Sequence, residues 1–182
     1  MKLFFQLLLI LLLTPSAGFT KIEVLLPGLE KTGGGTIRYL GIFKVYDAEL
    51  FTRPDLHADA VLSDNTSKCL VLSYDLDISA EDIINGANAI LKRQHSTEVL
   101  ENASQEIEIL HNSYTDVSSG DRYALCYNAQ SSVTKLLFND VEVVEIQSTE
   151  FARLYFGIWL GSKEPISQTL REDLLSRLDS QG

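Results

Sequence analysis

The chain has 182 residues and a formal net charge of −10 at pH 7. This acidity makes nucleic acid and anionic lipid surfaces poor partners, because both are themselves polyanions, although solubility alone also accounts for it. The length suits one domain with a substantial core and is too short for two ordinary domains.

The N-terminus has the pattern of a secretory signal peptide. Lys2 precedes an apolar run over residues 3–13, and a short stretch with small residues follows. Ser16 and Gly18 are small enough for the cleavage positions, which predicts a signal peptide over residues 1–18. A membrane anchor is the alternative, but eleven helical residues span only about 16 Å of a hydrocarbon layer about 30 Å thick. We therefore expect an exported, periplasmic protein with no transmembrane segment after cleavage.

The first half of the remaining domain, residues 19–182, is predicted to be mostly β-structure. Residues 22–26 predict a strand, and Gly33-Gly34-Gly35 predicts a flexible turn. A phosphate loop is not indicated, because no Lys-Ser or Lys-Thr follows these glycines. The stretch 36–52 is too long for one ordinary strand, so it predicts a bend, a bulge or two strands. Residues 68–75 predict a further strand.

Helices and strands then occur in separate runs. Residues 79–94 predict an amphipathic helix capped by Ser79, and residues 97–111 predict a second, polar helix. Three strands are predicted at 121–129, 133–138 and 141–146, the last two joined by a two-residue turn at Asn139-Asp140. Two helices are predicted after them, an apolar one between Ser148 or Thr149 and Gly161, and an amphipathic one over 165–178. This order predicts an α+β fold in which helices cover an antiparallel sheet.

The two cysteines, Cys69 and Cys126, both lie in strand-like segments. An oxidising compartment permits a disulfide between them, and two buried thiols are the alternative. No Cys-x-x-Cys is present and the histidines have no ligand spacing, so we predict neither a metal site nor a cofactor. Without a Gly-x-Ser-x-Gly elbow, nucleophilic hydrolysis is not indicated either.

Two cations, Arg38 and Lys44, interrupt an apolar and aromatic segment that also contains Tyr46. An arginine beside a pocket wall can hold a carboxylate or a phenolate with its bidentate fork. Arg38 and Tyr46 are eight residues apart, which places both side chains on one face of an unbroken strand, whereas a bulge reverses this parity. The alternative is that both cations lie on the solvent face while Tyr46 packs in the core.

Three segments in order carry a resemblance to a known family. They are the stretch from Gly33 to Phe51, the strand from Gly120 to Tyr127, and the helix that ends in Trp159-Leu160-Gly161. Together they resemble the chalcone isomerase-like family and, more narrowly, its small exported bacterial branch. The resemblance extends over residues 22–178 and implies a curved antiparallel sheet, packed on one side by a helical layer, with a ligand cleft between them.

The family resemblance also implies a function. Plant members cyclise chalcones to flavanones, whereas other members bind fatty acids without such activity. In both groups an arginine in the early strand region meets the anionic part of the ligand, with a hydroxyl residue further along. Arg38 and Tyr46 match these two positions, but the other hydroxyl and amide residues of the plant site have no match.

We therefore expect a non-catalytic, periplasmic binding protein for a small amphipathic anion such as a fatty acid. In this hypothesis Arg38 is the charge partner and Tyr46 donates a hydrogen bond. One alternative is an isomerase or lyase that acts on a phenolic or enone-like compound. Another is an interaction protein whose cleft is filled by side chains, and the sequence indicates no particular protein partner.

Overall fold

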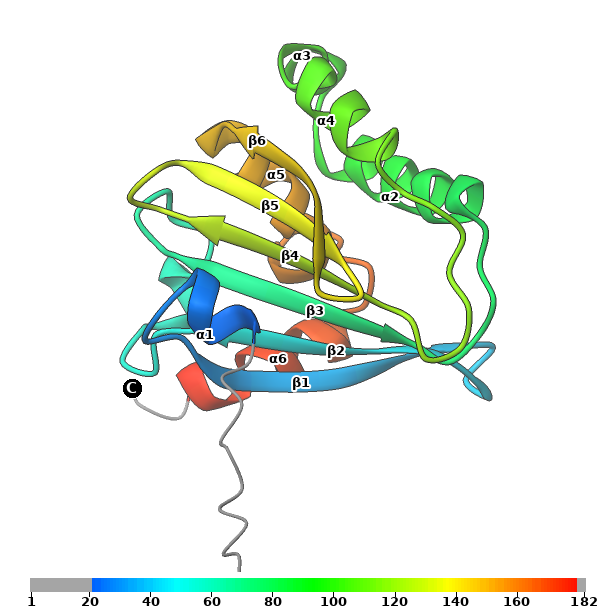
Figure 1. Cartoon of the computed structure of the whole chain (residues 1–182), viewed down its shortest axis with the longest axis horizontal. Coiled ribbons are helices and arrows are strands. Elements are labelled where there is room, and N and C mark those ends of the chain that lie inside the picture. Colours follow the sequence, from blue (N-terminus) through cyan, green and yellow to red (C-terminus); the bar gives the residue numbers. More distant parts are fainter. Residues whose placement is uncertain (1–20, 180–182) are drawn as a thin grey trace, which may run out of the picture.

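A six-stranded antiparallel sheet, with the strands in the order β1-β2-β3-β4-β5-β6, organises the molecule (Figure 1). The computed structural model describes residues 21–179, so the predicted signal peptide lies outside the described residues. The strands are β1 (Glu30–Tyr39), β2 (Phe43–Thr52), β3 (Lys68–Tyr74), β4 (Arg122–Asn128), β5 (Val133–Phe138) and β6 (Val141–Gln147). The helices are α1 (Lys21–Leu25), α2 (Ala80–Gln94), α3 (Thr97–Asn102), α4 (Ser104–His111), α5 (Thr149–Leu160) and α6 (Gln168–Asp179), with a 3₁₀ turn at Ala58–Ala60. The predicted α+β class is confirmed.

Side chains that alternate along the strands give the sheet two apolar faces. On β3, Leu70, Leu72 and Tyr74 join the main core, which includes the buried faces of α5 and α6. The intervening residues Cys69 and Val71 join a smaller cluster under α1 on the opposite face. Figure 1 shows this arrangement, with α1 in front of the strands and α5 and α6 behind them. Within residues 21–179, no helix combines the length and the apolar character that crossing a membrane requires.

The first described element is a helix, so the strand predicted over residues 22–26 is wrong. Within α1, Ile22 and Leu25 are three residues apart and therefore point to the same side, where they pack on the sheet together with Leu26. A five-residue apolar run does not distinguish a strand from a short helix by its periodicity. The sheet surface available to α1 decides the outcome.

The glycine run forms part of β1, so the flexible turn predicted there is also wrong. Helix α6 lies directly on this part of the strand. The approach is so close that a Cβ atom added at Gly33 would come within 1.9 Å of the Leu174 carbonyl oxygen. At Gly35 an added Cβ would come within 2.8 Å of Leu170 Cδ1. The glycines therefore allow a close approach of helix to strand rather than a bend.

The long stretch 36–52 forms a hairpin, which confirms one of the predicted outcomes. Its turn consists of Leu40, Gly41 and Ile42, and the first two have positive φ (52° and 71°). The register shifts between Ile37 and Arg38, which indicates a bulge opposite them in β2. At the other predicted hairpin, Asn139 and Asp140 also have positive φ, as expected.

Serine caps begin helices α2 and α5, as the sequence predicts. The Ser79 hydroxyl accepts a hydrogen bond from the Asp82 amide at 3.1 Å, and the Ser148 hydroxyl accepts one from the Phe151 amide at 3.1 Å. The predicted polar helix over residues 97–111 is interrupted at Ala103, which separates α3 from α4. Ala103 is buried in the main core, so the break between the two helices is packed against the rest of the fold.

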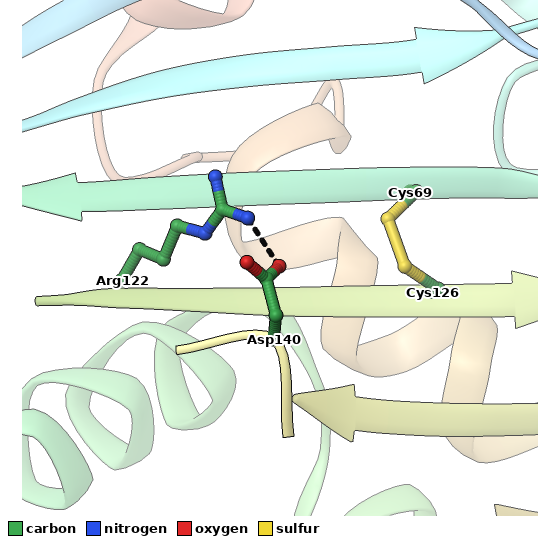
Figure 2. Close-up of a disulfide and its surroundings, with 4 residues drawn as sticks. All are labelled: Cys69, Arg122, Cys126 and Asp140. Carbon is green, nitrogen blue, oxygen red and sulfur yellow. Dashed lines mark hydrogen bonds and ion pairs between the residues drawn. A yellow bond between two sulfur atoms is a disulfide. The ribbon is translucent and has the colours of Figure 1, made fainter. Parts of the chain in front are cut away.

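A disulfide joins β3 to β4, which settles the alternative that the sequence left open. Cys69 and Cys126 lie directly opposite one another in the strand register, and their sulfur atoms are bonded (Figure 2). Both residues are buried beneath α1. Figure 2 also shows the ion pair between Arg122 at the start of β4 and Asp140 in the β5–β6 turn.

Candidate ligand-binding cavity

A cavity of about 170 Å³ lies between the sheet and the helices α2 and α5. For comparison, an engineered apolar cavity of about 150 Å³ binds benzene. The cavity is therefore large enough for a single ring or a short alkyl chain. Its walls are mainly apolar and aromatic: Tyr46, Leu70, Leu72, Tyr74, Ile78, Asp82, Ile83, Gly86, Ala87, Ile90, Tyr114, Tyr123, Leu125, Leu136, Tyr155, Ile158, Trp159 and Ile166.

Small residues on α2 leave room for the cavity. Gly86 and Ala87 line it from the middle of this helix, and a Cβ atom added at Gly86 would have no neighbour within 4 Å. Asp82 and Gly86 are exposed to solvent and also line the cavity, so the cavity opens beside the first half of α2. A glycine inside a helix costs roughly 0.5–1 kcal/mol relative to alanine, so the space at Gly86 is kept at some expense in stability.

Five tyrosines line the cavity, and the rings of four of them are in contact in a row. Tyr46 and Tyr74, opposite each other on β2 and β3, have ring centroids 5.6 Å apart in an edge-to-face arrangement. Tyr74 is followed by Tyr123 at 6.2 Å, and Tyr123 by Tyr114 at 5.1 Å. Edge-to-face packing of this kind is favourable for aromatic rings. These ring contacts therefore stabilise the wall in addition to the burial of its apolar surface.

Most of the tyrosine hydroxyls have protein partners. The Tyr114 and Tyr155 hydroxyls are 3.2 Å apart, and the Tyr123 hydroxyl accepts a hydrogen bond from the Thr115 amide at 2.9 Å. The Tyr46 hydroxyl accepts a hydrogen bond from Trp159 Nε1 at 3.1 Å. These bonds connect the sheet to α5 and to the segment after α4.

Burial makes four of these phenols harder to ionise than an ordinary tyrosine. It raises the pKa of Tyr46 to about 12. It also raises the pKa values of Tyr74, Tyr114 and Tyr155 above the ordinary tyrosine value. Desolvation disfavours the phenolate, so these four hydroxyls, which are protonated at neutral pH as any tyrosine is, also stay protonated at higher pH than an exposed tyrosine does.

The structure does not bring the two sequence-predicted site residues together. Tyr46 is buried in the cavity wall, whereas Arg38 is exposed and donates to the Ile42 carbonyl oxygen at 3.4 Å. The register shift between Ile37 and Arg38 reverses the side-chain parity that an unbroken strand would give. Lys44, the other cation of this segment, pairs with Asp47 at 2.7 Å and Asp75 at 3.0 Å.

Sequence reasoning did not identify Tyr74, Tyr114, Tyr123 or Tyr155 as site residues. A partial signal exists for Tyr155, because it lies four residues before Trp159 on one face of α5. Tyr74 follows Leu70 and Leu72 at alternate positions of β3 and so shares their face. Within residues 21–179, no group of three or more His, Cys, Asp or Glu side chains is placed to hold a metal ion.

His111 lies behind the cavity wall, with its ring centroid 5.9 Å from that of Tyr155. It is buried, and its Nε2 atom has no hydrogen-bond partner in the described part of the chain. Burial lowers the pKa of His111 to about 4. The folded protein therefore contains a neutral imidazole at pH values where a histidine in the unfolded chain becomes charged.

We expect His111 to make the protein less stable in mild acid. Between the unfolded pKa of about 6.5 and the folded pKa, the unfolded chain binds a proton that the folded chain does not. The free energy of unfolding should therefore fall by up to about 3 kcal/mol as the pH drops through this window. Above the unfolded pKa, His111 should cause no such loss. Urea unfolding at pH 7 and at pH 4.5 measures the loss, and His111→Phe should reduce it. An equal acid sensitivity of the two proteins would contradict the assignment.

Comparison with known proteins identifies the family to which this fold belongs. A model of the chalcone isomerase-like family matches residues 26–176, whereas no curated protein matches the chain. Among solved structures, a fatty-acid binding protein of Arabidopsis thaliana is similar, with a TM-score of 0.65 and 15% sequence identity. The similarity covers 84% of this chain and 89% of that one, and at this identity it concerns the fold. Because the family match spans most of the sequence, the chain belongs to the chalcone isomerase-like family.

Proposed function

We propose that this protein is a non-catalytic binding protein for a small amphipathic molecule, such as a fatty acid, whose apolar part occupies the cavity. The cavity between the sheet, α2 and α5 is the observation that carries the proposal. The likeness in fold to a fatty-acid binding protein supports it. Export to the periplasm through the signal peptide over residues 1–18 is part of the same proposal. The molecular mass of the protein recovered from the periplasm tests it, because the mass shows whether residues 1–18 have been removed.

The charges around the cavity favour binding over isomerisation. Cyclisation of a chalcone-like compound requires a phenolate to be held and a developing enolate to be stabilised. Among the described residues that line the cavity there is no Lys, Arg or His to supply a positive charge. The phenols are kept neutral, and Arg38 lies outside the wall, so the lining suits a binding site better than an active site.

The chain contains a single tryptophan, and it lies in the cavity wall. Trp159 emission should therefore change when a ligand enters, which allows a direct titration with saturated fatty acids of increasing length. Each buried methylene contributes about 0.8 kcal/mol, so affinity should rise roughly fourfold per carbon until the cavity is filled.

Ala87→Leu should weaken ligand binding at least about tenfold, because its added carbons take up the space of ligand carbons. Ala87 is buried and lines the cavity. Ala89 lies on the exposed side of the same helix, so Ala89→Leu is the matched control and should bind as the unmodified protein does. Trp159 fluorescence titration of the three proteins makes the comparison.

Two results would contradict the proposal. One is Trp159 emission that neither a fatty acid nor an uncharged analogue with the same alkyl chain changes, and the other is an equal loss of affinity in the two leucine variants. Turnover of a chalcone would instead favour the isomerase alternative.

A further inference from the structure

The cavity is nearly free of formal charge. Of the described residues that line it, only Asp82 is a carboxylate, and no cation is among them. Asp82 is exposed at the start of α2, where it accepts a hydrogen bond from the Ser79 hydroxyl at 2.7 Å. A ligand that enters beside Asp82 therefore meets a negative charge at the rim and phenols further inside.

Tyr74 has the one lining tyrosine hydroxyl without any hydrogen-bond partner in the described part of the chain. The residue is only 5% exposed. Its hydroxyl oxygen is nevertheless not among the sealed, unpartnered polar atoms, which are Gln94 Oε1, His95 Nε2, His111 Nε2 and Thr134 Oγ1. The Tyr74 hydroxyl oxygen therefore adjoins space that a small molecule can reach. Because Tyr74 lines the cavity, that space belongs to the cavity. A buried polar group in this situation requires a partner from outside the protein.

Tyr46 offers a second donor beside the first. Its oxygen accepts from Trp159 Nε1, so the hydroxyl proton is left to be donated. Tyr46 and Tyr74 are directly paired across β2 and β3. A carbonyl oxygen has two lone pairs and can accept from two neighbouring hydroxyls.

We propose that the cavity selects a ligand whose polar group is an uncharged hydrogen-bond acceptor, such as a ketone, an ester or a protonated carboxylic acid, with Tyr74 and Tyr46 as the donors. This inference rests on the proposed function and names the class of ligand. It differs from the anion expected from the sequence, in which Arg38 is the charge partner.

The physical reason is desolvation. An ionised carboxylate that enters this cavity loses its water without gaining a counter-charge, and it passes the carboxylate of Asp82. A neutral carbonyl loses much less on leaving water, and it gains hydrogen bonds from the Tyr74 and Tyr46 hydroxyls, whose protons no protein acceptor takes up in the described part of the chain. The preference should therefore come from the head group and not from the apolar tail.

Two probes with the same heptyl chain, methyl heptyl ketone and octanoic acid, test the inference by Trp159 fluorescence. At pH 7 the ketone should bind at least about tenfold more tightly than octanoate. Tyr74→Phe, which removes one oxygen and keeps the ring, should weaken ketone binding roughly three- to tenfold. Tyr39→Phe, at a tyrosine that is 63% exposed, and Arg38→Ala should leave it unchanged.

The possible outcomes separate the inference from the proposed function. Tighter binding of octanoate than of the ketone, or loss of octanoate binding in Arg38→Ala, would overturn the inference and leave the binding function standing. Equal ketone affinity of the Tyr74→Phe variant and the unmodified protein would also overturn it. If neither probe nor any longer fatty acid changes Trp159 emission, the proposed function itself fails and the inference fails with it.

Discussion

Gly33→Ala is expected to destabilise the fold by at least about 3 kcal/mol, which corresponds to a fall of roughly 10 °C in the melting temperature. The added Cβ atom would lie 1.9 Å from the carbonyl oxygen of Leu174, and this neighbour is backbone in α6. Relief therefore requires a shift of the whole helix relative to β1. Leu170, Leu174 and Leu178 of α6 are fully buried in the main core, so the shift would disturb the core packing as well.

Gly34→Ala is the matched control for this prediction. The same added atom at Gly34 would lie 3.2 Å from the Ala48 carbonyl oxygen and 3.3 Å from the flexible Lys31 side chain. We expect a change within about 1 kcal/mol of the unmodified protein, because the loss of glycine entropy in the unfolded chain offsets a mild contact. Thermal unfolding followed by circular dichroism compares the two variants. Equal melting temperatures for Gly33→Ala and Gly34→Ala would contradict the close packing of α6 on β1.

Removal of the disulfide should have the other large effect on stability. In the Cys69→Ala/Cys126→Ala variant, the free energy of unfolding should fall by about 4 kcal/mol. The bridge joins residues 57 positions apart, so it removes a large amount of conformational freedom from the unfolded chain. The two alanines also leave slightly less apolar contact beneath α1.

Reduction of the unmodified protein provides the internal check. Urea unfolding in the presence of a thiol reductant should bring its midpoint close to that of the double variant, and the variant itself should not respond. Identical midpoints of the two proteins under oxidising conditions would show that the bridge contributes nothing to stability. Disulfides persist in oxidising compartments, so the bridge also supports the export that we propose.

The elements that could be predicted from the sequence are those with strong local signals. The Ser79 cap and the apolar spacing of α2 identify that helix, and Asn139-Asp140 identifies the β5–β6 turn, because each signal acts within a few residues. The nearly all-apolar α5 is likewise recognisable as a core helix from its own residues. The family resemblance rests on α5 and on two other segments, Gly33 to Phe51 and Gly120 to Tyr127, and the match over residues 26–176 confirms the chalcone isomerase-like family.

The misassigned elements depend on partners that are distant in the sequence. Residues 21–25 form a helix, and the sheet face around Cys69 and Cys126 offers it an apolar surface. Gly33 lies in a strand that α6, about 140 residues later in the chain, covers closely. The helix can approach this strand only because Gly33 has no Cβ atom. Neither requirement leaves a trace in the local pattern.

The candidate site shows the same division. The sequence predicted Tyr46 as a site residue and paired it with Arg38 through an even spacing, and Tyr46 lies in the cavity wall. A single bulge in the β1–β2 hairpin separates them, because one extra residue reverses the face of every side chain beyond it. Tyr74, Tyr114 and Tyr155 come from three different segments, and only the packed fold brings their hydroxyls to one wall.

By itself, the sequence determined the acidic character, the α+β class, the capped helices and the family, because composition and short-range periodicity carry that information. The signal peptide over residues 1–18 remains its prediction. Only the tertiary structure decided the disulfide, the close contact of α6 with Gly33, and the uncharged, phenol-lined cavity. These three features depend on strand register and on contacts between segments far apart in the chain, where one residue of shift changes which side chains meet.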